Sequence, residues 1–391
     1  MRSFCFVAML LTLAPSVGLS APLPYSLINT LTHPEPDREN GLRSVSLTDE
    51  YLFVGAPSFR IPGDSGQIFM YDVSGSNLLN TFDDPTPETL GFRSFAANES
   101  LLAVVDEVEL FGRTRQVHLY DVDSGELRHT LKSPIAGHGG FAGNVAISGD
   151  HVIVGAYALG STFGPTFPAR VFVYDAVSGD LRHTFTPPDD VDTRGWGEVF
   201  DIFGSTLAIG APFDERTPVL LYDAVSGQRT KSVKFQKDGD FDYLRIRDDR
   251  ILLAQNLRDT YLLDTDGDLL NAFEFPDTTS SGGLLEFSGD NVLIGSFGSL
   301  QAGNTVTPAA WLYDGDSGEL IQHFEDAAPS DRFVSMTSNP SGNQIALVKL
   351  FDGEVLVYST VPEPTSLQLG AVLAAIFGTL SRQLPRMLPQ S

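Results

Sequence analysis

The chain has 391 residues, and its 50 acidic against 25 basic residues give a formal net charge of −25. Such an acidic surface repels phosphate backbones, and no basic stripe offsets it, so composition excludes nucleic acid as the expected partner. We interpret the acidity as a source of solubility outside the cytoplasm. The single cysteine, Cys5, lies near the N-terminus, so the rest of the chain has neither a disulfide nor a thiol.

Residues 1–20 have the pattern of a secretory signal. Arg2 precedes an apolar run, and the small residues Gly18 and Ser20 lie just before Ala21. A run this short with these flanks is typical of a cleaved export signal rather than of a structural helix. We therefore expect the mature chain to be exported.

The body of the chain, residues 21–360, is a repeat. Each copy has a short apolar strand that ends in Tyr-Asp, a turn usually closed by Ser-Gly, and a second strand. The copies are marked by Tyr71, Tyr120, Tyr174, Tyr222 and Tyr313, with a degenerate copy at Leu263 and a last one at Tyr358. The spacing gives a period of about 48 residues, which is typical of four-stranded propeller blades.

Two further strands precede the Tyr-Asp strand in each repeat. One ends in a small-residue corner, as in Val54-Gly55-Ala56-Pro57, and the other opens with glycine and a large apolar residue, as in Gly91-Phe92. These runs are short, β-branched and bounded by turn residues, which favours strands over helices. A single blade cannot bury both of its faces, so the repeats must stack around an axis. The sequence thus predicts an all-β, seven-bladed propeller of four-stranded antiparallel blades.

The two ends of this repeat predict how the ring closes. The last repeat reaches Pro362 before a fourth strand can form, whereas the segment Leu27–Leu31 closely matches the outer strand Leu78–Phe82 of the first full blade. We expect the N-terminal strand to complete the last blade, because this pairing removes an open sheet edge.

Residues 361–391 differ abruptly in composition. The motif Pro362-Glu363-Pro364 is followed by an apolar run and then by Arg382 and Arg386. A helix over residues 365–384 would be about 30 Å long, which is barely enough to cross a membrane. This order of motif, short helix and arginines resembles the bacterial PEP-CTERM sorting signal, although the tail here is longer and less basic than usual. An ordinary C-terminal membrane anchor is the alternative.

The PEP-CTERM resemblance has implications for localisation and partners. It implies transient anchoring in the inner membrane through the C-terminal helix and processing by an exosortase-type enzyme. The protein would then be delivered to the cell surface or the extracellular matrix.

The repeat body resembles the FG-GAP propellers, the integrin-α-like family, through its Gly-Ala-Pro corners and Gly-Phe strand openings. Several blades of that family carry a calcium loop before the Gly-Ala-Pro strand. The corresponding turns here, such as Ser148-Gly149-Asp150, have too few oxygens for the six to eight ligands that calcium takes. The segment Asp264–Asp268 resembles a calcium loop, but position twelve is Phe275 and not glutamate, so we interpret it as a polar hairpin turn.

Residues that repeat at one structural position are expected to serve the scaffold. The repeated aspartates, such as Asp72 and Asp121, are expected to accept hydrogen bonds from amides of their own turns. His129 and His183 occupy equivalent Leu-Arg-His-Thr segments, and no histidine spacing matches a zinc site. We therefore predict no catalytic residue, metal or cofactor. A Ser-His-Asp triad needs proximity only in space, so it stays open.

Sequence variety is concentrated in long loops, which we expect on one face of the ring. Six acidic residues near that face are candidates for binding a cation or a basic partner, with a solvated rim as the alternative. They are Asp83, Asp84, Glu88, Asp189, Asp190 and Asp192.

Three functional hypotheses follow. The favoured one is a non-catalytic surface propeller whose long-loop face binds extracellular protein or polysaccharide. The second is an enzyme that uses the central channel, such as a quinoprotein-like dehydrogenase, a lyase or a glycosidase. The inner strands read as mostly apolar and small, and Trp196 and Trp311 do not form a quinoprotein-type tryptophan repeat. The third is a passive structural component of the surface.

Overall fold

A computed structural model describes most of the chain between residues 25 and 360. The described residues are 25–35, 41–57, 66–85, 92–107, 115–135, 140–156, 168–192, 195–214, 219–235, 241–255, 259–273, 282–296, 309–325, 333–350 and 352–360. Within these ranges, no helix is long and apolar enough to cross a membrane. The export signal at residues 1–20, the Pro362-Glu363-Pro364 motif and the expected membrane helix all lie outside the described residues.

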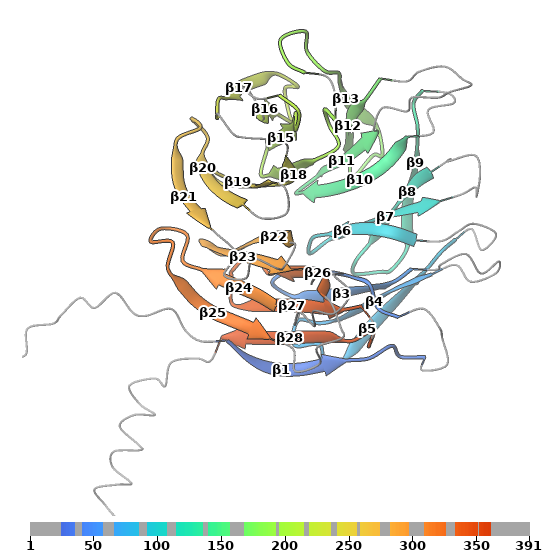
Figure 1. Ribbon diagram of the computed structural model, residues 1–391. Coiled ribbons are helices and arrows are strands. Elements are labelled where there is room, and N and C mark those ends of the chain that lie inside the picture. Colours follow the sequence, from blue (N-terminus) through green and yellow to red (C-terminus); the bar gives the residue numbers. More distant parts are fainter. Residues whose placement is uncertain are drawn as a thin grey trace, which may run out of the picture. The chain divides into compact units, whose positions relative to one another are not determined.

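The strands form seven four-stranded antiparallel sheets, which are the blades of a ring (Figure 1). Blade 1 comprises β2 (Ser44–Leu47), β3 (Tyr51–Ala56), β4 (Gln67–Asp72) and β5 (Leu78–Asp83). Blade 2 comprises β6 (Phe92–Ala97), β7 (Leu101–Glu107), β8 (Arg115–Asp121) and β9 (Leu127–Lys132). Blade 3 comprises β10 (Phe141–Ser148), β11 (His151–Ala156), β12 (Arg170–Asp175) and β13 (Leu181–Phe185). Blade 4 comprises β14 (Phe200–Phe203), β15 (Thr206–Gly210), β16 (Val219–Asp223) and β17 (Arg229–Val233). Blade 5 comprises β18 (Phe241–Arg247), β19 (Arg250–Gln255), β20 (Asp259–Asp264) and β21 (Leu269–Phe273). Blade 6 comprises β22 (Gly282–Ser288), β23 (Asn291–Ser296), β24 (Ala309–Tyr313) and β25 (Leu320–Glu325). Blade 7 comprises β26 (Phe333–Ser338), β27 (Gln344–Lys349), β28 (Val355–Thr360) and β1 (Tyr25–Leu31). The predicted seven-bladed all-β fold is confirmed.

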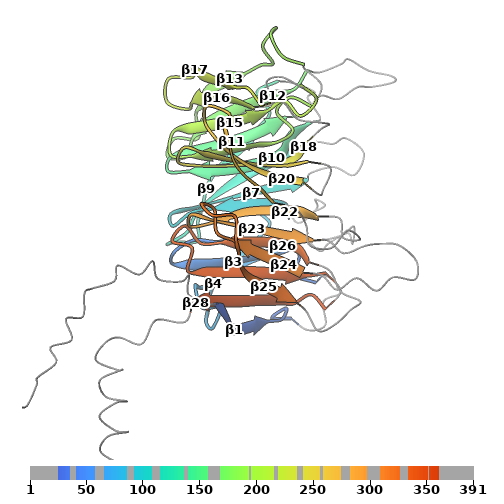
Figure 2. The ribbon, with the colours of Figure 1, turned by 60° about the vertical axis from the view of Figure 1, so that its left-hand side comes forward.

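The N-terminal strand closes the ring, as predicted. β1 pairs antiparallel with β28, with Leu27 opposite Tyr358 and Leu31 opposite Val355. In Figure 1 and Figure 2, β1 lies along β28 in both views. The first described strand therefore occupies the outer edge of the last blade, and no separate eighth sheet forms among the described residues.

The hydrophobic core lies between the blades. Each of the seven core clusters joins side chains of two adjacent blades, as where Val54 and Phe69 of blade 1 pack with Val348 of blade 7. The middle strands supply most of this core because both of their faces are covered. Burying each Val, Leu or Phe side chain contributes about 1.5–3 kcal/mol before the loss of chain entropy is subtracted.

The glycine of the small-residue corner, Gly-Ala or Gly-Ser, is required by the close approach of neighbouring blades. A Cβ on Gly155 would lie 2.5 Å from Phe200 of the next blade, and one on Gly295 would lie 2.8 Å from Met336. Such distances leave no room for a side chain. The corner thus repeats because it allows an aromatic or long side chain of the next inner strand to reach the core.

Polar side chains on the outer strands bond six of the blades to the next blade. His129 Nε2 donates a hydrogen bond to the carbonyl oxygen of Val177 at 2.8 Å, and His183 Nε2 donates to that of Val225 at 2.9 Å. The equivalent position bridges four other junctions through Asn29, Lys231, Asn271 and Gln322. The structural role predicted for the two histidines is confirmed.

The repeated aspartates serve their own turns, as predicted. Asp175 Oδ1 accepts hydrogen bonds of 2.8 Å from the amides of Val177 and Ser178, and its second oxygen pairs with Arg182. Ser178 and then Arg182 hold the pKa of Asp175 low, at about 2. Asp264 likewise accepts from the amide of Asp268 at 2.9 Å, so the calcium-like segment is a hairpin turn between β20 and β21.

Candidate functional site

The inner strands of the seven blades line a central cavity of about 420 Å³. One position recurs in all seven blades, because each inner strand pairs in the same register with the third residue of the second strand. The residues at this position form a layer around the channel, and all of them line the cavity. They are Ser46, Ala96, Ala146, Asp201, Arg245, Glu286 and Thr337.

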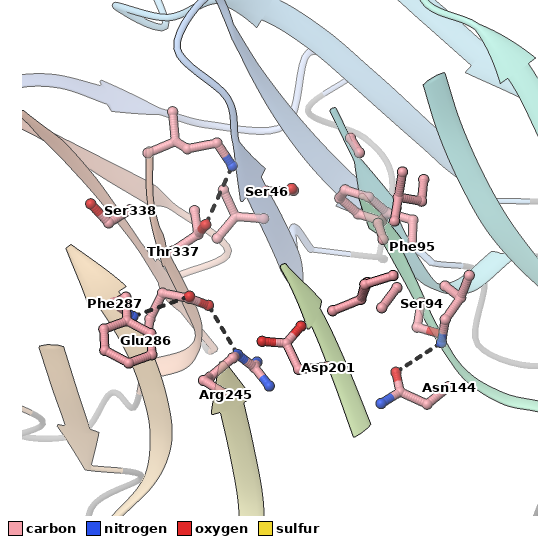
Figure 3. Close-up of a pocket in the computed structure, with 18 of the residues that line it drawn as sticks. Ser46, Ser94, Phe95, Asn144, Asp201, Arg245, Glu286, Phe287, Thr337 and Ser338 are labelled. Atoms are coloured by element: carbon pink, nitrogen blue, oxygen red, sulfur yellow. Dashed lines mark hydrogen bonds and ion pairs between the residues drawn. The ribbon is translucent and has the colours of Figure 1, made fainter. Parts of the chain in front are cut away.

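Three consecutive blades place charges in this layer. Figure 3 shows Asp201, Arg245 and Glu286 directed into the same space from β14, β18 and β22. Arg245 Nε donates to Glu286 Oε2 at 3.2 Å, and the side chains of these two residues are 33% and 25% exposed. One side of the channel wall therefore carries the cationic side chain of Arg245 near two carboxyl groups, those of Asp201 and Glu286.

Asp201 has an environment that favours its protonated form. Burial raises the pKa of Asp201 to about 6, and Glu286 acts in the same direction. Arg245 and the amide of Ile246, which donates to Asp201 Oδ2 at 2.9 Å, act in the opposite direction but do not outweigh burial. Burial acts to lower the pKa of Arg245, yet Glu286 and Asp201 together keep it raised. Arg245 therefore stays charged, while Asp201 titrates near pH 6.

The rest of the wall combines hydroxyl and amide groups with apolar side chains such as Phe95 and Phe287 (Figure 3). Ser335 and Thr337 accept hydrogen bonds from the amides of Val45 and Leu47, at 3.3 and 3.4 Å, and so join blade 7 to blade 1 around the channel. Ser44, Ser46, Ser94 and Asn144 also line the cavity. The sequence indicated mostly apolar and small inner strands, and such residues do line the cavity, but charged, hydroxyl and amide groups line it as well.

The predicted loop-face residues are divided between two places in the ring. Asp83 ends β5 of blade 1 and Asp84 follows it, whereas Asp189, Asp190 and Asp192 follow β13 of blade 3. Glu88 lies outside the described residues. Each group has local partners. Asp83 accepts from Gln67 at 2.8 Å, and Asp190 pairs with Arg229 at 2.9 Å. Arg229 holds the pKa of Asp190 low. A binding surface formed by these acids stays a prediction.

Asp84 is the exception among these acids, since it is buried. It lies with two residues of blade 2, Asp106 and His118, and one ligand atom from each of the three lies within 4.8 Å of the others. The charged channel layer and this buried cluster were both missed in the sequence. An alignment of the seven repeats could have revealed both, because it shows charged residues at positions where other blades have small or apolar residues.

Comparisons with known proteins support the fold and nothing finer. No family model matches this chain, and no curated protein matches it. A similar solved structure is the β-propeller domain of Cps50 (Swd1) from Myceliophteria thermophila, with a TM-score of 0.58 and 13% sequence identity. The similarity covers 86% of this chain and 100% of that chain. At this identity, the likeness shows a shared β-propeller fold.

Proposed function

We propose that this protein is an exported, surface-displayed propeller that binds a polymer of the cell envelope or extracellular matrix without transforming it. The observation that carries the proposal is the channel wall, where serines, an asparagine and the Asp201–Arg245–Glu286 set surround one cavity. Hydroxyl, amide and charged groups in a concave site are the usual means of orienting a polar ligand. A polysaccharide, rich in hydroxyl groups, is the ligand that this lining suits best, and an extracellular protein is the alternative.

Export and display are proposed from the two ends of the chain. Residues 1–20 would act as a cleaved signal, and residues 361–391 would act as a PEP-CTERM-type tail that anchors the protein transiently in the inner membrane. An exosortase-type enzyme would then process the tail. We propose an FG-GAP-type repeat for the ring on its Gly-Ala corners, whose close blade-to-blade approach gives that motif a physical reason.

The binding proposal is tested with the purified full chain against a panel of bacterial polysaccharides and matrix proteins. Replacing Arg245 by methionine removes the channel cation and puts an unbranched apolar side chain in its place. We expect at least a tenfold loss of affinity, which corresponds to about 1.4 kcal/mol, the size of one charged hydrogen bond. The matched control is Arg182→Met, because Arg182 is also 33% exposed and paired with a carboxylate but lies on an outer strand. Equal loss in both variants, or no loss in Arg245→Met, would contradict the proposal.

A channel enzyme is the second candidate, and one observation favours it. Asp201 and Glu286 are two carboxylates on one wall, and Asp201 has a pKa near 6, which suits a general acid in glycoside cleavage. The same panel separates the two functions when new reducing ends are measured over time. Turnover that Asp201→Asn abolishes would replace the binding proposal with a glycosidase.

A further inference from the structure

Blade 2 departs from the repeat at a core position of its third strand. His118 pairs in register with Val104, and the residues at the same register in the other six blades are all apolar or aromatic: Phe69, Phe172, Leu220, Tyr261, Trp311 and Leu356. His118 is nevertheless 1% exposed. The scaffold alone therefore does not explain a histidine here, since phenylalanine fills this position in the blades on either side.

A second departure lies beside the first. Asp106 of β7 occupies the register at which blades 1 and 3 have Ala56 and Ala156, and it is fully buried. Its Oδ2 lies 3.3 Å from His118 Nε2 and 2.9 Å from the side-chain nitrogen of Gln116. Two charge-bearing groups thus replace an alanine and a phenylalanine of the repeat.

The third member comes from the neighbouring blade. Asp84 follows the outer strand of blade 1 and is 6% exposed. At the corresponding junction between blades 7 and 1, His33 follows the outer strand and packs edge-on against Phe69, with ring centroids 5.2 Å apart. Asp84 and His118 hold those two places at the junction of blades 1 and 2. The approach of these side chains is therefore built into the ring geometry.

The geometry points to a divalent metal site formed by Asp84, Asp106 and His118. Two ligands about 2.05 Å from a tetrahedral zinc ion lie about 3.3 Å apart, which is the separation between His118 Nε2 and Asp106 Oδ2. Asp84 needs only a small movement to join them, because the ligand atoms of all three residues lie within 4.8 Å of one another. The Gln116 side chain is 3.2 Å from His118 Nε2, and turning its amide over would present a carbonyl oxygen as a fourth ligand.

Charge and the outer partner of the histidine support the same assignment. Ionised carboxylates are costly to bury unless they are neutralised, and this cluster contains two carboxyl groups. A divalent ion balances both. Thr130 Oγ1 lies 3.0 Å from His118 Nδ1, and an Nδ1–H that donates to this hydroxyl leaves the lone pair of Nε2 directed at the ion. A set of one imidazole and two carboxylates suits Zn²⁺ or Mn²⁺ better than Ca²⁺, which takes more oxygens.

The site is tested by metal content and thermal unfolding of the purified full chain. After chelation, the chain is incubated with Zn²⁺ or Mn²⁺ alone, passed through gel filtration and analysed for bound metal. We expect about one bound ion per wild-type chain and a rise in the unfolding temperature of about 3 °C or more with the ion present. Co²⁺ should give a visible absorption spectrum typical of oxygen and nitrogen ligands.

The variants use residues that the repeat itself supplies. His118→Phe and Asp106→Ala install the side chains of the neighbouring blades, and both should lose the bound ion while still folding in the presence of chelator. His151→Tyr is the matched control, since Tyr51 is its register equivalent in blade 1, and it should bind metal like the wild type. Wild-type chain that binds no more metal than His118→Phe would overturn the inference. This result is independent of the channel test, which measures polymer binding.

Discussion

At the scale of single residues, the repeat gives aspartate two opposite environments. Asp175 accepts the amide of Ser178 in an outer turn and pairs with Arg182, and these interactions, with the amide of Val177, lower its pKa to about 2. Asp201 accepts one amide in the channel wall, and burial raises its pKa to about 6. The Asp175 carboxylate thus stabilises the folded protein in its charged form, whereas Asp201 stabilises it in its neutral form.

We predict that Asp201 makes the free energy of unfolding depend on pH with the opposite sign to the turn aspartates. Its pKa in the fold, near 6, lies above the unfolded value of 3.8, so its stabilising contribution is full below pH 3.8 and is lost as the pH rises to 6. Asparagine imitates the neutral form, so Asp201→Asn should raise the free energy of unfolding at pH 7 by about 1–2 kcal/mol.

Denaturant unfolding of both proteins at pH 4 and pH 7 measures this difference. At pH 4 the two free energies of unfolding should nearly coincide, because Asp201 is then protonated in the fold. An equal difference at both values would show that titration of Asp201 is not its source.

At the scale of elements, the stability of the ring depends on the junctions between outer strands and turns. Gly179 closes the turn after β12 with a φ of 73°, and a Cβ there would lie 2.9 Å from His129 of the preceding blade. The same histidine donates to Val177 in that turn. The turn is therefore both a hairpin and the receptor for the neighbouring blade.

Substituting Gly179 by alanine should cost more than the conformation alone. Strain at positive φ accounts for about 1 kcal/mol, and displacement of His129 should bring the loss to about 2–3 kcal/mol. Gly149→Ala is the control, since Gly149 has a φ of 53° but no atom within 4 Å of its Cβ position. Thermal unfolding of the two variants isolates the junction contact, and equal losses would show that this contact contributes nothing.

At the scale of the whole molecule, one strand joins the two ends of the propeller. β1 covers the edge of β28 and places Leu31 in the core between blades 7 and 1. Tyr25 adds a contact to the previous blade, where its amide donates to Gln322 Oε1 at 2.6 Å. A single strand therefore contacts blades 6, 7 and 1.

Removing residues 1–31 should destabilise the ring, whereas removing residues 1–24 should not. The longer deletion exposes the edge of β28 and the core beneath Leu31, so we expect a loss of at least about 3 kcal/mol and self-association through the open edge. Thermal unfolding and light scattering compare the two deletions. A ring that stays monomeric and equally stable without β1 would disprove the closure argument.

The repeat made most of the fold predictable. The Tyr-Asp spacing predicted seven blades, and the likeness of Leu27–Leu31 to Leu78–Phe82 predicted the closing strand. These predictions succeeded because strand pairing and blade packing are local and recur at each repeat. The role of the turn aspartates could be predicted for the same reason, since their partners lie within a few residues.

The two candidate sites could not be predicted in this way. Asp201, Arg245 and Glu286 are far apart in the chain. They meet only because they occupy equivalent positions on the inner strands of three blades, which all line one channel. Asp84 meets His118 only because adjacent blades share a core. The sequence by itself determined the scaffold, because repeated local patterns specify strands and turns. Only the tertiary structure decided which of the residues that depart from the repeat lie close together. The reason is that residues at equivalent positions of different blades become neighbours only when the blades close into a ring.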